Sequence, residues 1–151
     1  MAHWYFAYGS NLWANQMIQR IGYVDDPEHP PRIARLENYR LVFQHLECGG
    51  EAFANILRPG PGVIGVLYHC SLVQLQTLDR YESGYERISL EVTDLRGEVL
   101  AAEAYLIKPS SEVEYGIPSN EYLKKIILGA TEHGLPRSYI DSIIPAQGAP
   151  D

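Results

Sequence analysis

The stretch YFAYGSNL at residues 5–12 determines how the rest of the chain is interpreted. Its first half is rich in aromatic residues, which favour the pleated and half-buried surface of a β-strand. The Gly-Ser-Asn that follows favours a turn, and an apolar pattern of helical period runs from Trp13 to about Arg20. The stretch therefore predicts a strand, a tight polar loop and a helix.

The loop at residues 9–11 has the composition of an anion-binding turn. Gly9 allows a sharp turn or a close approach to a ligand, and Ser10 or Asn11 is expected to cap the following helix. Free N–H groups of the loop and the positive end of the helix would then face one point, which suits a carboxylate or an oxyanion. An ordinary capped turn without a ligand is the alternative interpretation.

Composition limits the class of protein. The 151 residues are 46% hydrophobic and 21% charged, as expected for one globular domain. The net charge of −7, without a basic stretch, argues against nucleic-acid partners and against binding to anionic membrane surfaces. No apolar run reaches the roughly 20 residues of a membrane-spanning helix, and no signal peptide is apparent. We therefore expect a cytoplasmic protein.

The cysteines and histidines indicate neither a disulfide nor a metal site. Cys48 and Cys70 are far apart in the sequence and are expected to be free thiols in a reducing compartment. The five histidines show no spacing typical of metal ligands, so no metal is expected.

Strands mostly follow strands along the chain, which favours an α+β fold over a doubly wound parallel sheet. Strands are expected at residues 32–46, 52–57, 63–69, 86–95 and 99–107, with a turn at Glu37-Asn38 inside the first. Helices are expected at residues 71–82, 119–133 and 137–144. Ser71 with Gln74 forms a capping-box pattern, and Ser119 is expected to cap the next helix. One domain is expected at residues 1–145, with a C-terminal tail at 146–151.

Glu82 is the first candidate for catalysis. It lies near the end of a predicted helix, between Tyr81 and Tyr85. Aromatic surroundings disfavour the charged carboxylate and so raise its pKa, which suits a general acid/base; a solvated surface glutamate is the alternative. Tyr105 and Tyr122 are candidates for polar contacts in a pocket, or else for the aromatic core.

Four ordered segments resemble the γ-glutamylcyclotransferase family. YFAYGSNL resembles its N-terminal signature, and LDRYE at residues 78–82 resembles the segment that carries its catalytic glutamate. EAYLI at 103–107 resembles a strand with a substrate-contacting tyrosine. Residues 119–139, which include YLKKIILGATEHGLP, are similar to its C-terminal helices. The resemblance covers nearly the whole chain.

The resemblance implies a small mixed β-barrel of about six strands with flanking helices, and neither a metal nor an organic cofactor. It also implies a reaction in which the free α-amine of a γ-glutamyl group attacks that group's own γ-carbonyl, which releases 5-oxoproline and an amine. Glu82 would be the acid/base, and a homodimer is expected only at the level of the family. The residues that would bind the small-molecule γ-glutamyl substrate are Tyr8, Gly9, Ser10, Asn11, Leu12, Tyr105 and Tyr122.

Some alternatives stay open. Residues 83–87 form a shorter segment than in the animal enzyme, and the chain stops at Asp151, so the leaving group could be an amino acid, an amine or a natural-product precursor. The resemblance disfavours glutathione, because glutathione-specific relatives usually read YGSL where this chain reads YGSN. A non-catalytic binding module on the same fold, or a γ-glutamylamine hydrolase or acyltransferase with Ser10 as nucleophile, are the other functions considered.

Overall fold

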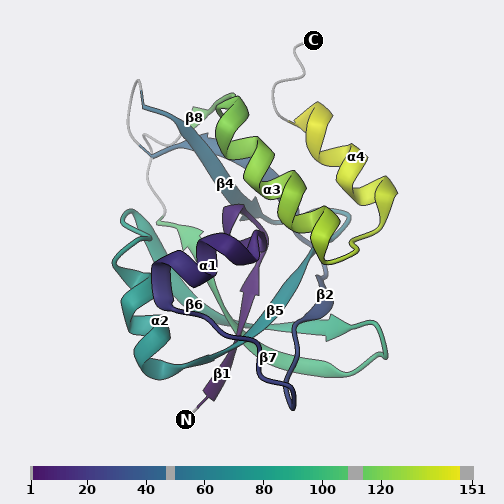
Figure 1. Ribbon diagram of the computed structural model, residues 1–151. Helices are drawn as coiled ribbons and strands as arrows, with labels where there is room; N and C mark the ends of the chain where they lie inside the picture. The colour runs from purple at the N-terminus through teal and green to yellow at the C-terminus, as the bar shows by residue number, and fades with distance from the viewer. Residues whose placement is uncertain (1, 47–49, 109–113, 147–151) are drawn as a thin grey trace.

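The computed structural model describes residues 2–46, 50–108 and 114–146 (Figure 1). The strands are β1 (Ala2–Ala7), β2 (Arg32–Leu36), β3 (Arg40–His45), β4 (Ala52–Leu57), β5 (Val63–Ser71), β6 (Tyr85–Asp94), β7 (Val99–Ile107) and β8 (Glu114–Tyr115). The helices are α1 (Ala14–Ile21), α2 (Leu72–Asp79), α3 (Asn120–Glu132) and α4 (Arg137–Ala146), and a 3₁₀ turn, η1, covers Ser10–Leu12.

Five strands form a closed barrel in the order β1-β5-β2-β6-β7. β1 pairs antiparallel with β5 along its whole length, from Ala2↔Ser71 to Ala7↔Val66. The barrel closes through a parallel pairing of β1 with β7 at Tyr5↔Glu103. β1 is thus held between two barrel strands, and the loop that follows it emerges at a fixed position.

A second sheet, in the order β4-β3-β8, lies beside the barrel. In Figure 1 α3 and α4 lie together in the upper part of the molecule, and α1 and α2 lie side by side at the left; the contacts between these pairs agree with the view. α3 also packs against η1. This arrangement surrounds the loop after β1 with elements from distant parts of the chain.

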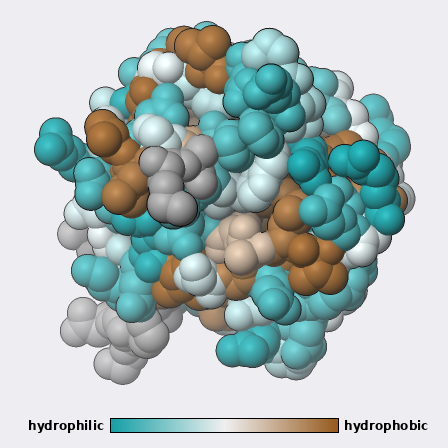
Figure 2. Space-filling model, turned by 90° about the horizontal axis from the view of Figure 1, so that it is seen from below, coloured by the Kyte–Doolittle hydropathy of each residue, from teal (hydrophilic) through white to brown (hydrophobic). Residues whose placement is uncertain are grey.

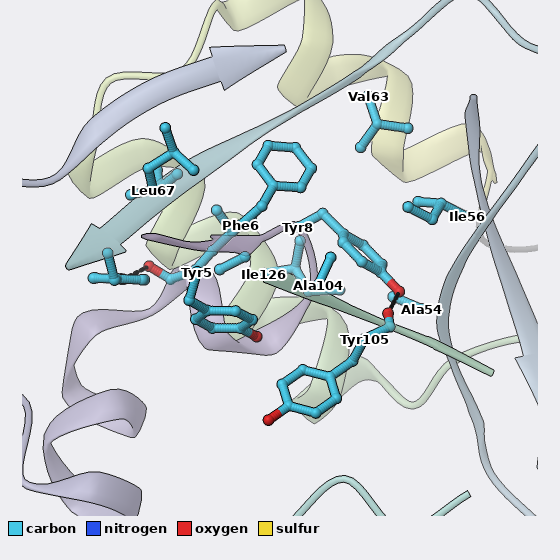
Figure 3. Close-up of a cluster of buried hydrophobic side chains, with 14 of the residues drawn as sticks. Tyr5, Phe6, Tyr8, Ala54, Ile56, Val63, Leu67, Ala104, Tyr105 and Ile126 are labelled. Atoms are coloured by element: carbon cyan, nitrogen blue, oxygen red, sulfur yellow. Dashed lines mark hydrogen bonds between the residues drawn. The ribbon is translucent and has the colours of Figure 1, made fainter. Parts of the chain in front are cut away.

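Large side chains fill the barrel and the space under α3 (Figure 3). Phe6, Leu67 and Ile126 are completely buried, although they come from β1, β5 and α3. Apolar burial of this kind is the main favourable term in folding. The same core fixes Tyr5 and Tyr8, which flank Phe6 on β1 and are nearly buried as well.

The predicted caps of two helices are confirmed. The Ser71 hydroxyl accepts from the Gln74 N–H while the Gln74 side chain accepts from the Ser71 N–H, a complete capping box. Ser119 accepts from the N–H of Tyr122 at the start of α3.

The predicted cap of the first helix is wrong. Ser10 and Asn11 belong to η1, and α1 begins at Ala14 with Trp13 as its N-cap and no side-chain capping bond. The side chains form hydrogen bonds with other side chains instead: Ser10 with Gln16, and Asn11 with Tyr5. The predicted helix at residues 71–82 is also too long at its end, because α2 ends at Asp79 and Glu82 lies in the turn that follows.

The predicted α+β class with a small barrel is confirmed, and the structure refines the strand count. Residues 32–46 form two strands, β2 and β3, separated by a turn in which Asn38 has a φ of 64°. The barrel itself has five strands, with β3, β4 and β8 in the second sheet. Cys48 and residues 147–151 of the predicted tail lie outside the described residues, so the domain limit at residue 145 stays a prediction.

The surface seen in Figure 2 is mixed, with brown apolar residues in separate patches between teal hydrophilic ones. Cys70 is buried in the barrel wall, and burial raises the pKa of its thiol to about 12. Within the part of the chain that the structure describes, none of the helices is both long and apolar enough to cross a membrane.

Candidate active site

A cavity of about 290 Å³ opens where the loop after β1 meets α1, β4, the turn after α2 and the start of α3. Seven of the eight predicted site residues line it: Tyr8, Gly9, Ser10, Asn11, Glu82, Tyr105 and Tyr122. These residues are separated by up to 114 positions in the sequence, so only the fold brings them together.

Leu12 is the exception. Its side chain is completely buried, and it is not among the residues that line the cavity. Its carbonyl oxygen accepts a hydrogen bond from the Tyr68 hydroxyl at 2.8 Å. Leu12 therefore anchors the loop in the core, where its backbone is so close to α3 that a Cβ on Gly129 would lie 2.3 Å from the Leu12 carbonyl carbon.

A tight turn holds Glu82 at the cavity wall. Its N–H donates to the Asp79 carbonyl at 3.2 Å, and its own carbonyl accepts from the Tyr85 N–H at 3.0 Å. Gly84 has a φ of 90° in this turn, a conformation that favours glycine. The backbone therefore fixes the position from which the carboxylate projects.

The Glu82 side chain is only 15% exposed. Burial raises its pKa, and the carboxylate of Asp79 adds to this effect, while Arg20 and the hydrogen bond from Asn11 oppose it. The net shift is upward. A carboxylate with a raised pKa that faces a cavity is suited to accept and then return a proton near neutral pH.

Asn11 connects the loop to Glu82. It is 3% exposed, and its Nδ2 donates to the Tyr5 hydroxyl at 2.9 Å and to Glu82 Oε1 at 3.0 Å. Its Oδ1 accepts from Gln16 Nε2 at 2.9 Å and from Arg20 Nη1 at 3.4 Å. Both ends of the amide are satisfied, so its orientation is determined by the network.

Two residues of α1 at the site were missed by the sequence analysis. Gln16 Nε2 donates to Ser10 Oγ at 2.7 Å, and Arg20 Nη1 lies 3.7 Å from Glu82 Oε1. The guanidinium of Arg20 also lies over the Tyr81 ring, 5.1 Å from its centre. Their spacing of four residues puts both on one helix face, and this was the available signal that the helix serves the loop.

Tyrosines form much of the remaining wall. The Tyr8 hydroxyl donates to the Tyr105 carbonyl (Figure 3). The Tyr105 hydroxyl in turn donates to Asp79 Oδ1 at 2.5 Å, so Tyr105 presents its ring to the cavity while its hydroxyl is engaged behind it. The Tyr85 hydroxyl donates to the Ala54 carbonyl at 2.6 Å.

Tyr122 differs from these three tyrosines. Its hydroxyl oxygen accepts from the Ala54 N–H at 3.0 Å, and this bond does not use the hydroxyl's own hydrogen. Gly9 lies directly beside it, because a Cβ added to Gly9 would be 3.4 Å from the Tyr122 oxygen and 3.2 Å from the Ala54 Cβ. Close approach, rather than an unusual φ, is therefore the reason for glycine at this position.

The chain is similar in sequence and structure to several known proteins. The AIG2-like family matches residues 62–143. The γ-glutamylcyclotransferases of mouse and human are each 32% identical over 151 residues, covering 92% of this chain and 76% of theirs. A solved structure described as a γ-glutamyl cyclotransferase is 29% identical and superposes with a TM-score of 0.84, covering 95% of this chain and 87% of that one.

A yeast structure described as a γ-glutamyl cyclotransferase specific to glutathione shares the fold at a TM-score of 0.60 and 15% identity. That level of identity supports only the fold. The match of the family over more than half of the chain, together with the mouse and human relatives, confirms the resemblance seen in the sequence: the chain belongs to the AIG2-like, γ-glutamylcyclotransferase family.

Proposed function

We propose that this protein is a γ-glutamylcyclotransferase that uses Glu82 as its only acid/base. The observation that carries the proposal is the position of this carboxylate, which is nearly buried, faces the cavity and is held by Asn11 of the YGSN loop. The mouse and human relatives support the activity.

The substrate supplies both reacting groups. The α-amine of the γ-glutamyl group attacks the γ-carbonyl carbon, a C–N bond forms, and the ring of 5-oxoproline closes as the γ-amide C–N bond breaks. The main task of the protein is then to hold the extended glutamyl chain in a folded conformation, because proximity and orientation lower the barrier of such a cyclisation.

Proton transfer is the task of Glu82. At neutral pH the α-amine is largely an ammonium, so Glu82 takes one proton to make it a nucleophile. The same carboxyl group returns that proton to the nitrogen of the leaving amine. The regenerated carboxylate accepts the second proton that the attacking nitrogen loses on ring closure, and this proton goes to the released amine, which departs as an ammonium ion. General acid/base catalysis of this kind typically contributes ~10²–10⁴-fold. The raised pKa of Glu82 brings it closer to the pH at which such a transfer is efficient.

The loop of residues 8–11 is proposed to hold the glutamyl moiety. Gly9 allows close approach, and Tyr122 offers a hydroxyl hydrogen beside it. Arg20 and Lys125 are the cationic residues among those that line the cavity within the described part of the chain. They suit the carboxylate-bearing half of such a substrate.

Ser10 is a weaker candidate for catalysis. Its Oγ accepts from Gln16 Nε2, which is not a base. Among the cavity-lining residues of the described ranges histidine does not occur, and Lys125 makes no hydrogen bond to Ser10. A serine nucleophile needs an adjacent base, so the hydrolase or acyltransferase alternative has less support than the cyclotransferase. A non-catalytic binding module would leave the buried, cavity-facing Glu82 without a role.

The reaction is proposed to need no metal or organic cofactor, since the residues around Glu82 supply the acid/base and the substrate supplies the nucleophile. A cytoplasmic location and the lack of nucleic-acid or membrane partners are proposed from the acidic composition. A homodimer is proposed from the family resemblance alone, and sedimentation analysis of the purified protein tests it.

The experiment that tests the function is a product assay over a panel of γ-glutamyl amino acids, γ-glutamyl amines and glutathione. Formation of 5-oxoproline with release of an equal amount of amine supports the cyclotransferase. Free glutamate would indicate a hydrolase. Binding of a panel member without any product would indicate the binding module.

A further inference from the structure

A second group of chemically active side chains lies outside the cavity. Asp26 Oδ2 is 3.0 Å from His29 Nδ1 and 3.9 Å from His69 Nδ1. The two imidazole rings are stacked, with centres 4.1 Å apart. One ligand atom from each residue lies within 4.8 Å of the others, and all three residues are partly exposed.

The fold builds this cluster from two distant segments. Asp26 and His29 share a tight turn in which the His29 N–H donates to the Asp26 carbonyl at 2.9 Å. The N–H of Glu28 donates to Asp26 Oδ1 at 3.0 Å, which turns Oδ2 towards the histidines. His69 comes from β5, where its ring packs 4.8 Å from that of Trp4 on β1.

His69 lies on the face of β5 that is opposite to Tyr68 and to the cavity. Trp4 pairs with His69, and the next pair along the two strands is Tyr5 with Tyr68. Successive residues of a strand point to opposite faces. Because Tyr68 is completely buried and Tyr5 lines the cavity, His69 points away from both. Asp26, His29 and His69 are absent from the cavity-lining residues of the described chain.

We propose that Asp26, His29 and His69 bind a divalent transition-metal ion of the zinc type. Two imidazole nitrogens and one carboxylate oxygen are ligands typical of Zn²⁺, and water would complete the coordination. In a tetrahedral site with metal–ligand bonds of about 2.0–2.2 Å, neighbouring ligand atoms are separated by a distance between the two seen here. These are 3.0 Å from Asp26 Oδ2 to His29 Nδ1 and 3.9 Å to His69 Nδ1. A small movement of the His69 ring towards the turn would complete the site.

The charges around the cluster are compatible with a cation. Arg32 is the nearby positive group, and its guanidinium is paired with Asp94 at 3.2 Å and Glu98 at 3.0 Å.

This site departs from the expectation that the chain has no metal ligands. The spacing Asp26-x-x-His29 gives only two of the ligands, and the third comes from a strand 40 residues later. The bound ion would tie the turn at residues 26–29 to the barrel wall. It would therefore affect stability and not the chemistry in the cavity.

The test is a calorimetric titration of the metal-free full-length protein with Zn²⁺ alone. We expect binding of one ion per chain, with Mg²⁺ unable to compete. In NMR spectra of the wild-type protein, the imidazole signals of His29 and His69 should shift on titration while those of His133 stay unchanged. When Co²⁺ replaces Zn²⁺, the protein should show the visible absorption bands of a four-coordinate cobalt ion.

Matched variants identify the ligands. His29→Asn and His69→Asn should each weaken Zn²⁺ binding at least tenfold. His3→Asn should leave it unchanged, because His3 pairs with Cys70 and so points to the other face of β1. Glu28→Gln, with the same loss of charge as Asp26→Asn, should weaken binding far less than Asp26→Asn.

Production of 5-oxoproline should be the same with and without Zn²⁺, so this test is independent of the proposed catalytic function. Two results would overturn the proposal: no Zn²⁺ binding by the wild-type protein, or binding that leaves the His29 and His69 signals of the wild-type protein unchanged.

Discussion

The side-chain amide of Asn11 donates a hydrogen bond to the carboxylate of Glu82 at 3.0 Å, across 71 residues of sequence. One residue belongs to the YGSN loop and the other to the turn after α2. The bond favours the ionised carboxylate and therefore opposes the rise in pKa that burial causes. The loop that is proposed to hold the substrate thus also tunes the group that is proposed to move its proton.

The first prediction follows from that bond. Asn11→Ala removes a donor to the ionised Glu82, so the pKa of Glu82 should rise further. In the pH–rate profile, the limb over which kcat/KM increases with pH should then shift to higher pH. The loss of a buried polar network should also lower the free energy of unfolding by about 1–3 kcal/mol. A pH–rate profile with parallel denaturant unfolding measures both effects.

Asn55→Ala is the matched control for this variant. Asn55 is also 3% exposed and bonds to Gln44 and to the Ile107 N–H, but it does not line the cavity. We expect a similar loss of stability and no shift of the pH limb. An unchanged limb in Asn11→Ala would show that the amide does not tune Glu82.

The second prediction concerns stability and pH. Because the folded state raises the pKa of Glu82 above its ordinary value of 4.5, the folded protein binds more protons than the unfolded chain in the window above that value. The free energy of unfolding should therefore fall as pH rises through this window. Glu82→Gln carries no titrating group, so this part of the fall should disappear.

The measurement is the melting temperature from pH 4 to 8, compared between wild type, Glu82→Gln and Glu86→Gln. Glu86 is an exposed glutamate of β6 and serves as the control for the change in charge. Glu82→Gln should gain stability relative to wild type as pH rises. Identical pH slopes in all three proteins would mean that Glu82 is not perturbed.

The third prediction uses the close packing of Gly9. A Cβ at this position would lie 3.2 Å from the Cβ of Ala54. Gly9→Ala should therefore displace the loop and lower kcat/KM several-fold, with a small loss of stability. Ala54→Gly removes the opposing methyl group, so the double variant should recover part of the loss, measured as a double-mutant cycle. Strictly additive effects would argue against the contact.

The fourth prediction concerns Tyr105. Its hydroxyl donates to Asp79, so Tyr105→Phe should lower the free energy of unfolding by about 0.5–1.5 kcal/mol. Since the ring that faces the cavity is retained, kcat/KM should fall by less than about threefold. A fall of tenfold or more without a loss of stability would instead indicate direct contact between the hydroxyl and the substrate.

Local structure was largely predictable from the sequence. The capping box at Ser71 and Gln74 and the turn at Asn38 depend on neighbouring residues, and both were predicted correctly. The start of α1 was not, because the side chains of Ser10 and Asn11 bond to Gln16 and Glu82 instead of capping a helix.

The fold and site depend on pairings that local patterns do not contain. The barrel closes at Tyr5↔Glu103, a parallel pairing between residues 98 positions apart. Residue composition and the resemblance to a family indicated Glu82 and the loop as candidates, but not the contact between them. Arg20 was missed because an arginine on a short helix is usually a solvated residue, and only the fold places it 3.7 Å from the Glu82 carboxylate.

The central claim is that Glu82 moves the proton, and the rate of 5-oxoproline formation by Glu82→Gln tests it most directly. Glutamine keeps the size of the side chain and can still accept from Asn11, but it cannot take a proton from the α-ammonium. With the best γ-glutamyl substrate, calorimetry should show retained binding while turnover falls at least ~10²-fold, and Glu86→Gln should match wild type. Turnover of Glu82→Gln above about a tenth of wild type would contradict the account, because loss of the general base must cost more than that.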